Sequence, residues 1–166
     1  MKTIYHLPAL VLAFLAHSCV QPPNYPNTPE IAYIGVNQQS IVQGNANNPA
    51  DTLEITFSFT DGDGDLGAEG NIVDLFLTDS RDGFTDIKKL PVIPDQGIGN
   101  GISGEITVRL PNKPFSICCI YPDNSQSCEA NPNFPTNEIS YMIQIQDRAG
   151  NMSNKIQTET ITILCN

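Results

Sequence analysis

The chain has no tryptophan and only two histidines, His6 and His17, both within its first 17 residues. Catalysis by a Ser-His-Asp or Cys-His arrangement requires an imidazole that takes up a proton near neutral pH. A catalytic zinc ion held by histidines requires the same side chain. If the leading residues are removed on export, the mature protein has no histidine, and these three kinds of active site are excluded.

Basic side chains are also scarce, since 8 Lys and Arg stand against 18 Asp and Glu and the formal net charge is −10. A domain this acidic repels nucleic acid phosphates, so we reject a nucleic-acid partner. The apolar runs are shorter than the roughly 20 residues that a membrane-spanning helix needs. The S-x-x-K motif of serine–lysine hydrolases is missing as well.

The first 18 residues have the order of a secretory signal peptide. Lys2 gives a short positive start, residues 7–16 are mostly apolar, and the small residue Ser18 precedes Cys19. Removal of Lys2 with this segment takes the formal charge from −10 to −11. We therefore expect an exported protein with about 147 mature residues, enough for one domain with its own core.

The five residues 15–19, LAHSC, resemble the loose lipobox of bacterial lipoproteins, particularly those of Bacteroidota. The resemblance implies a signal peptide over residues 1–18 and a diacylated Cys19 as the new N-terminus. Residues 19–29, rich in Pro and Asn, would then tether the lipid to a domain over residues 30–166. The alternative is ordinary signal cleavage, which leaves Cys19 free or disulfide-bonded.

In the resembled family, acidic residues directly after the lipidated cysteine favour export to the cell surface. Val20 and Gln21 stand there instead, with no acidic run. The expected location is therefore the cell envelope, on the outer membrane and facing the periplasm, with the membrane as a partner through the lipid.

Four cysteines follow Cys19, namely Cys118, Cys119, Cys128 and Cys165. An even number in an exported domain predicts two disulfides. A bond between the adjacent Cys118 and Cys119 would be strained, so Cys128 is expected to pair with one of them and Cys165 with the other. A thiolate metal site is the alternative, but the C-x-x-C spacing of zinc sites is missing.

From residue 30 onward, apolar residues alternate and do not recur at helical spacing. Residues 53–59, LEITFSF, give the clearest alternation, with every second residue apolar. The pattern predicts about seven short strands: residues 31–36 continued by 40–42, then 53–59, 72–77, 87–93, 106–110, 139–145 and 155–164. Seven strands with Gly and Pro between them predict an all-β fold, an antiparallel two-sheet sandwich.

The strand spacing resembles immunoglobulin-like or cadherin-like modules. Residues 147–151, DRAGN, resemble the D-x-A-G-N turn that precedes the last strand of many bacterial immunoglobulin-like domains. The resemblance implies an immunoglobulin-like sandwich, although the Cys-Trp-Cys core of antibody domains is missing.

Residues 61–67, DGDGDLG, are the one motif that favours a bound ion. Carboxylates at alternate positions of a glycine loop, Asp61, Asp63 and Asp65, can turn toward one point and supply the oxygens that calcium prefers. The motif is not an EF-hand, because Leu66 and Ile72 stand where Gly and Glu are required. The alternative is a loop that turns without metal. Three further aspartates, Asp79, Asp82 and Asp86, are expected in a solvated loop.

In an immunoglobulin-like sandwich, the loop after strand 53–59 and the loop of residues 147–154 lie at the same end. Asp147 and Asn151 would then complete a calcium site that Asp61, Asp63 and Asp65 begin. Calcium is the one cofactor that we expect.

The leading functional class is a non-catalytic binding or accessory module of the envelope, held near a membrane and directed at an envelope protein or a glycan. A purely structural envelope protein is the second class. A carboxylate-based glycan hydrolase is the third and least favoured, because such enzymes place a pair of acids across a cleft. No catalytic residue is therefore assigned.

Overall fold

A computed structural model describes residues 24–44, 51–67, 69–70, 72–94 and 101–166 of the chain, and these form ten strands and no helix. The described residues therefore contain no helix that could cross a membrane. The strands are β1 Glu30–Val36, β2 Ser40–Val42, β3 Asp51–Asp61, β4 Leu75–Asp79, β5 Thr85–Lys88, β6 Ile102–Asn112, β7 Thr136–Ile139, β8 Tyr141–Ile145, β9 Ile156–Gln157 and β10 Ile161–Leu164. The all-β prediction is confirmed.

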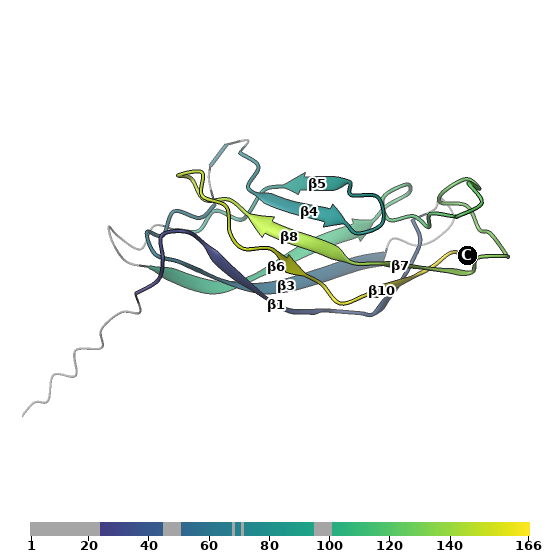
Figure 1. Cartoon of the computed structure of the whole chain (residues 1–166), viewed down its shortest axis with the longest axis horizontal. Helices are drawn as coiled ribbons and strands as arrows, with labels where there is room; N and C mark the ends of the chain where they lie inside the picture. The colour runs from purple at the N-terminus through teal and green to yellow at the C-terminus, as the bar shows by residue number, and fades with distance from the viewer. Residues whose placement is uncertain (1–23, 45–50, 68, 71, 95–100) are drawn as a thin grey trace, which may run out of the picture.

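The strands form three sheets. One has the order β1-β3-β6, the second β5-β4-β8-β9, and the third β2-β10-β7, in which β2 runs parallel to β10 while all other pairs are antiparallel. Figure 1 shows β5, β4 and β8 as a layer above β6, β3 and β1, with the two ends of the described chain at opposite ends of the long axis. This arrangement is consistent with a β-sandwich.

The core lies between the layers, and β3 contributes most clearly to it. Its alternate residues Leu53, Ile55, Phe57 and Phe59 are buried, as the apolar alternation predicts. Since β3 pairs with β6 over eleven residues, the two longest strands form a continuous floor under the second layer.

Three expected strands are each divided between sheets. The first, residues 31–36 continued by 40–42, breaks after Val36, so that β1 pairs with β3 while β2 pairs with β10. Residues 139–145 break at Ser140, so that β7 pairs with β10 while β8 pairs with β4. Ser80 takes up the backbone of Ser140, because its N–H donates to Ser140 O and its Oγ accepts from Ser140 N, both at 3.0 Å. Residues 155–164 break in the same way at Thr158, whose Oγ1 accepts from Tyr141 N at 2.9 Å.

Three other boundaries differ from prediction. The strand expected at residues 72–77 begins at Leu75, since Ile72 and Val73 are exposed. The strand expected at 87–93 ends at Lys88. Strand β6 is longer than the predicted residues 106–110, because it begins at Ile102 and ends at Asn112.

The predicted two disulfides are confirmed. Cys118 pairs with Cys128 and Cys119 pairs with Cys165, so neither bond joins the adjacent residues. The second bridge is fully within the core and joins the connection between β6 and β7 to the residue after β10. The first bridge closes a loop within this connection, and the second attaches the connection to the end of the chain's last strand.

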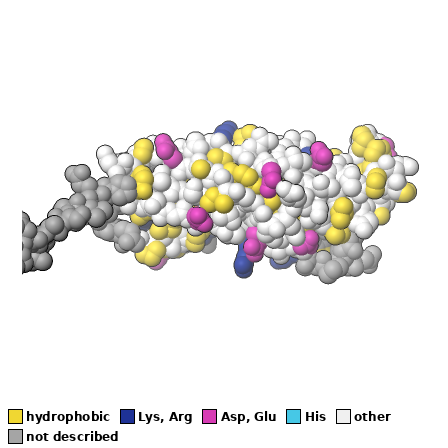
Figure 2. All heavy atoms as spheres, turned by 90° about the horizontal axis from the view of Figure 1, so that it is seen from below, with side chains coloured by type: hydrophobic (Ala, Val, Ile, Leu, Met, Phe, Trp, Pro, Cys, Tyr) yellow, Lys and Arg dark blue, Asp and Glu magenta, His cyan; other side chains and the backbone are white. Residues whose placement is uncertain are grey.

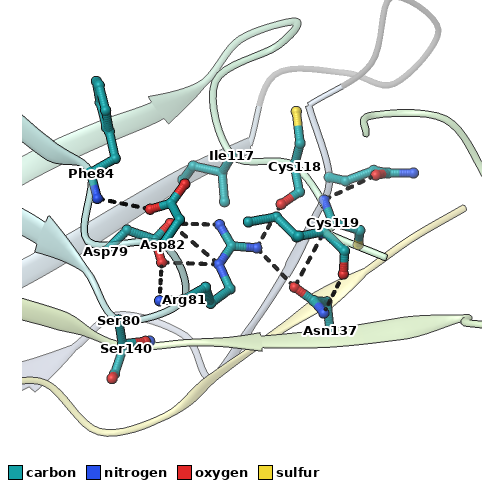
Figure 3. A network of polar contacts seen from close by, with 12 residues as sticks. Asp79, Ser80, Arg81, Asp82, Phe84, Ile117, Cys118, Cys119, Asn137 and Ser140 are labelled. Atoms are coloured by element: carbon teal, nitrogen blue, oxygen red, sulfur yellow. Dashed lines mark hydrogen bonds and ion pairs between the residues drawn. The ribbon is translucent and has the colours of Figure 1, made fainter. Parts of the chain in front are cut away.

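Arg81, in the turn between β4 and β5, fixes the same connection through hydrogen bonds (Figure 3). Its guanidinium pairs with Asp79 at 2.7 Å and donates to Cys118 O at 2.7 Å and Asn137 Oδ1 at 2.8 Å. Asp79 is thus a largely buried ion-pair partner, and the expectation of a solvated loop is wrong for it. Asp82 is exposed, as expected, and accepts from Phe84 N.

Candidate metal centre

The acidic loop begins where β3 ends. Asp61 is the last residue of β3 and is fully buried. Gly64 follows with a φ of 72°, a left-handed conformation that glycine adopts without strain. A Cβ at Gly62 would lie 2.3 Å from Tyr25 O, so a larger residue would collide with the segment that enters the domain. The two glycines therefore let three aspartates follow one another in a tight loop.

Asp61, Asp63 and Asp65 converge. One carboxylate oxygen from each lies within 4.8 Å of one from each of the others. In addition, the Oδ1 atom of each is buried and has no hydrogen-bond partner among the described residues. Buried polar atoms are nearly always paired, so three unpaired oxygens in one loop call for a partner that carries positive charge.

The remaining carboxylate oxygens hold the loop in shape. Asp61 Oδ2 accepts from Asp65 N at 2.9 Å, and Asp65 Oδ2 accepts from Ala149 N at 3.0 Å. Each of these two side chains therefore uses one oxygen to fix its own position and leaves the other free to coordinate an ion.

The pKa values of Asp61 and Asp65 are raised above that of a free aspartate. Burial raises the pKa of Asp61 from 3.8 to about 6, and the charges of Asp63, Asp65 and Asp147 add to the effect against a hydrogen bond from Asp65 that lowers it. Burial likewise raises the pKa of Asp65, followed by the charges of Asp147 and Asp63. The ionised cluster is thus unfavourable without a cation, and a bound cation would stabilise it.

The loop of residues 147–151 touches the acidic loop directly. Arg148 donates from its backbone N at 3.2 Å and from Nε at 2.7 Å to Asp65 O, and from Nη2 at 3.3 Å to Gly64 O. The guanidinium therefore binds backbone oxygens of the acidic loop. The carboxylates of Asp61, Asp63 and Asp65 remain available to a cation. No role was predicted for Arg148 from the sequence, although it lies inside the turn of residues 147–151.

Asp147 and Asn151 are engaged with each other. Asp147 Oδ1 accepts from Asn151 N at 2.7 Å and Asp147 Oδ2 accepts from Asn151 Nδ2 at 2.8 Å. Both oxygens of Asp147 thus close the turn, in which Gly150 has a φ of 93°. The structure places Asp147 near enough to raise the pKa values of the cluster, while Asn151 acts within its own loop.

The acidic loop also contacts the segment that precedes β1. Gly62 N donates to Pro26 O at 2.7 Å, so residues expected to tether the domain lie against the candidate site. Cys19, the expected lipidation residue, lies outside the described residues.

Asp74 is a buried carboxylate that was not predicted as a site residue, because it was expected inside a strand. Its Oδ1 accepts a hydrogen bond from Leu90 N, and its Oδ2 has no partner among the described residues.

Over the surface in Figure 2, acidic side chains are scattered along the length of the molecule, and basic ones occur at few points. The acidic loop differs from this scattered pattern, because its carboxylates converge and are partly buried.

Comparisons with family models, with curated proteins and with solved structures find no match to this chain.

Proposed function

We propose that this chain is a lipid-anchored module of the cell envelope that binds a partner without catalysis and is stabilised by calcium at the acidic loop. The single observation that carries the calcium site is the set of three buried, unpaired Oδ1 atoms on Asp61, Asp63 and Asp65. Only oxygen ligands are present, and calcium is a hard cation that takes oxygen ligands from flexible loops.

The direct contact between the acidic loop and the loop of residues 147–151 supports an immunoglobulin-like or cadherin-like arrangement. In such sandwiches these loops lie at one end. The contact of Gly62 with Pro26 gives the ion a role at that end, because an ion that orders the acidic loop also fixes the backbone that receives the tether. Calcium would thus set the direction in which the domain leaves the membrane.

The non-catalytic assignment is supported by the carboxylates outside the loop. The two acids that line the hollow between β4–β5 and the end of β6 are Asp79 and Asp86. Asp79 pairs with Arg81 at 2.7 Å and Asp86 pairs with Lys88 at 2.6 Å, so both are held in ion pairs.

A purely structural envelope role is the second candidate. If the immobilised chain captures one defined envelope protein or glycan, that result favours a binding module over a structural protein.

The first prediction concerns calcium. Titrating calcium into the ion-free chain should release or absorb heat at one site and raise the midpoint of thermal unfolding. At ten times the dissociation constant the stabilisation should be about 1.4 kcal/mol. Asp63→Asn should abolish both effects, while Asp82→Asn, which removes an exposed charge elsewhere, should leave them intact. No heat and no shift at 10 times the roughly millimolar constants typical of extracellular calcium sites would sink the proposal.

The second prediction concerns the anchor. Mass spectrometry of the protein made in a bacterium with a lipoprotein pathway should find Cys19 as the N-terminal residue, with diacylglycerol on its sulfur. Cys19→Ala should leave the protein in the soluble envelope fraction with the domain still folded. An unmodified cysteine, or a chain that begins elsewhere, would show ordinary signal cleavage.

A further inference from the structure

Strand β6 forms one edge of the β1-β3-β6 sheet and is eleven residues long. The opposite edge is covered, because Ile31 N donates to Asn154 Oδ1 and Ile31 O accepts from Asn154 Nδ2, both at 2.8 Å. Within the described part of the chain, no residue bonds the outer backbone edge of β6 between positions 103 and 109 in this way. A long edge strand with unpaired backbone groups is a template for another strand.

The register identifies the groups that face outward. On the β1 side of β3, Glu54 O accepts from Asn37 N at 3.0 Å and Glu54 N donates to Asn37 Oδ1 at 2.8 Å. Because backbone groups alternate along a strand, the N–H and C=O groups of Leu53, Ile55 and Phe57 in β3 face β6 instead. Their partners in β6 are Leu110, Val108 and Ile106. The β6 residues in between, Glu105, Thr107 and Arg109, therefore direct their N–H and C=O groups away from the sheet.

We propose that β6 pairs antiparallel with β6 of a second copy of this chain, about a two-fold axis at Thr107. Thr107 then lies opposite Thr107 of the second copy. Glu105 lies opposite Arg109 of the second copy, and Arg109 lies opposite its Glu105. The outward N–H and C=O groups of all three residues find partners, so the two sheets join into one of six strands.

Charge complementarity selects this occupant and this register. Glu105 and Arg109 are exposed on the same face of the sheet, two residues either side of Thr107. The two-fold axis therefore places each acid opposite a base, and opposite charges in directly facing positions stabilise a strand pair. The side chain of Arg109 is 74% exposed although its Nε pairs with Glu54 at 2.9 Å, so its guanidinium can contact a second acid.

The sequence also limits the ladder. Pro111 has no N–H to donate, and Pro at the rim of an edge strand restricts pairing beyond it. The backbone of Pro111 is already used, since its O accepts from Lys113 N at 2.9 Å. The shared segment thus covers residues 105–109 and ends before the strand does.

A matched pair of cysteine variants tests the pairing. Thr56 Oγ1 and Thr107 Oγ1 share a hydrogen bond of 2.9 Å, so Thr56→Cys and Thr107→Cys each break the same bond. Facing residues in a hydrogen-bonded antiparallel pair have Cα atoms about 5.5 Å apart, within disulfide reach. Two Thr56 positions would be about 14 Å apart across three strand spacings, beyond that reach.

The whole chain, purified in detergent and oxidised gently, should give a covalent dimer on a non-reducing gel for Thr107→Cys, about tenfold above Thr56→Cys. Both variants keep Cys19 and the two native disulfides, so these contribute equally. An equal, low yield from the two variants overturns the proposal. It is also the outcome expected if the edge binds a strand of another protein or stays unpaired.

Charge reversal tests the register in the Thr107→Cys background. Glu105→Arg alone and Arg109→Glu alone each place like charges opposite one another, so each should reduce the covalent dimer about tenfold. An equal mixture of the two variants places Arg opposite Glu at both positions and should restore a heterodimer. Cross-linking that is unchanged by either reversal, or not restored in the mixture, overturns the two-fold axis at Thr107.

Discussion

Replacing both Cys119 and Cys165 by Ala should lower the free energy of unfolding by about 4 kcal/mol. The bridge closes a segment with a sequence separation of 46 residues, and the loss of chain entropy that it imposes on the unfolded state grows with that length. Both cysteines are buried, at 0% and 2% exposure, so Ala avoids placing a polar group in the core. Against a typical total of about 5–15 kcal/mol, this loss is severe.

The other bridge provides the matched control. Cys118 and Cys128 have a sequence separation of 10, so replacing both by Ala should lower the free energy of unfolding by only about 3 kcal/mol. The backbone of residue 118 would still accept the hydrogen bond from Arg81, because that contact uses its carbonyl oxygen. Figure 3 shows this contact, which holds the connection between β6 and β7 independently of both disulfides.

Equilibrium unfolding in urea measures both variants. The midpoint should fall furthest for the Cys119 and Cys165 pair, with a larger dependence on urea because the unfolded chain is less restricted. Equal losses in the two variants, or a larger loss from the short bridge, would contradict this account.

The sequence predicts the fold well where one strand has one buried face. Leu53 to Phe59 alternate because β3 stays in a single sheet from end to end. The same pattern hides the division at Ser140, because Ile139, Tyr141, Ile143 and Ile145 are all buried whether or not the chain changes sheets. The hydrogen bonds with Ser80, 60 residues away, mark the crossing, and the local sequence pattern does not predict them.

The apolar residues at positions 72 and 73 predicted a buried strand, but in the structure the polar residue that follows them is buried and they are exposed. Ile72 and Val73 are 52% and 42% exposed, while Asp74 beside them is buried because its carboxylate accepts from Leu90 N. The acidic residues were predictable as candidates from their spacing. Which of their oxygens are free was not, because the bonds from Ala149 to Asp65 and from Asn151 to Asp147 depend on how two loops meet.

The ion-free protein should lose stability as pH rises from about 4 to about 7. The pKa of Asp61 is about 6 in the folded state against 3.8 for the free side chain, so between these values the folded state holds a proton that the unfolded state has released. Stability therefore decreases with rising pH in this window. The shift corresponds to about 3 kcal/mol at full value, and we expect about 2 because Gly62 and Asp63 beside it are only half-buried.

Asp61→Asn separates this electrostatic cause from other titrations. The amide oxygen can still accept from Asp65 N, while its NH₂ group can donate toward the unpaired oxygens of Asp63 and Asp65. In the presence of a chelator, this variant should be more stable than the original chain at pH 7, equally stable near pH 4, and unresponsive to calcium. Asp82→Asn should keep the original dependence of stability on pH.

Saturating calcium should flatten the dependence of stability on pH of the original chain above pH 6, because the ion favours the ionised carboxylates that protons would otherwise neutralise. A chelated chain that gains stability from pH 4 to 7, or an Asp61→Asn variant that is weaker at pH 7, would show that the three carboxylates do not repel one another as their burial and spacing imply.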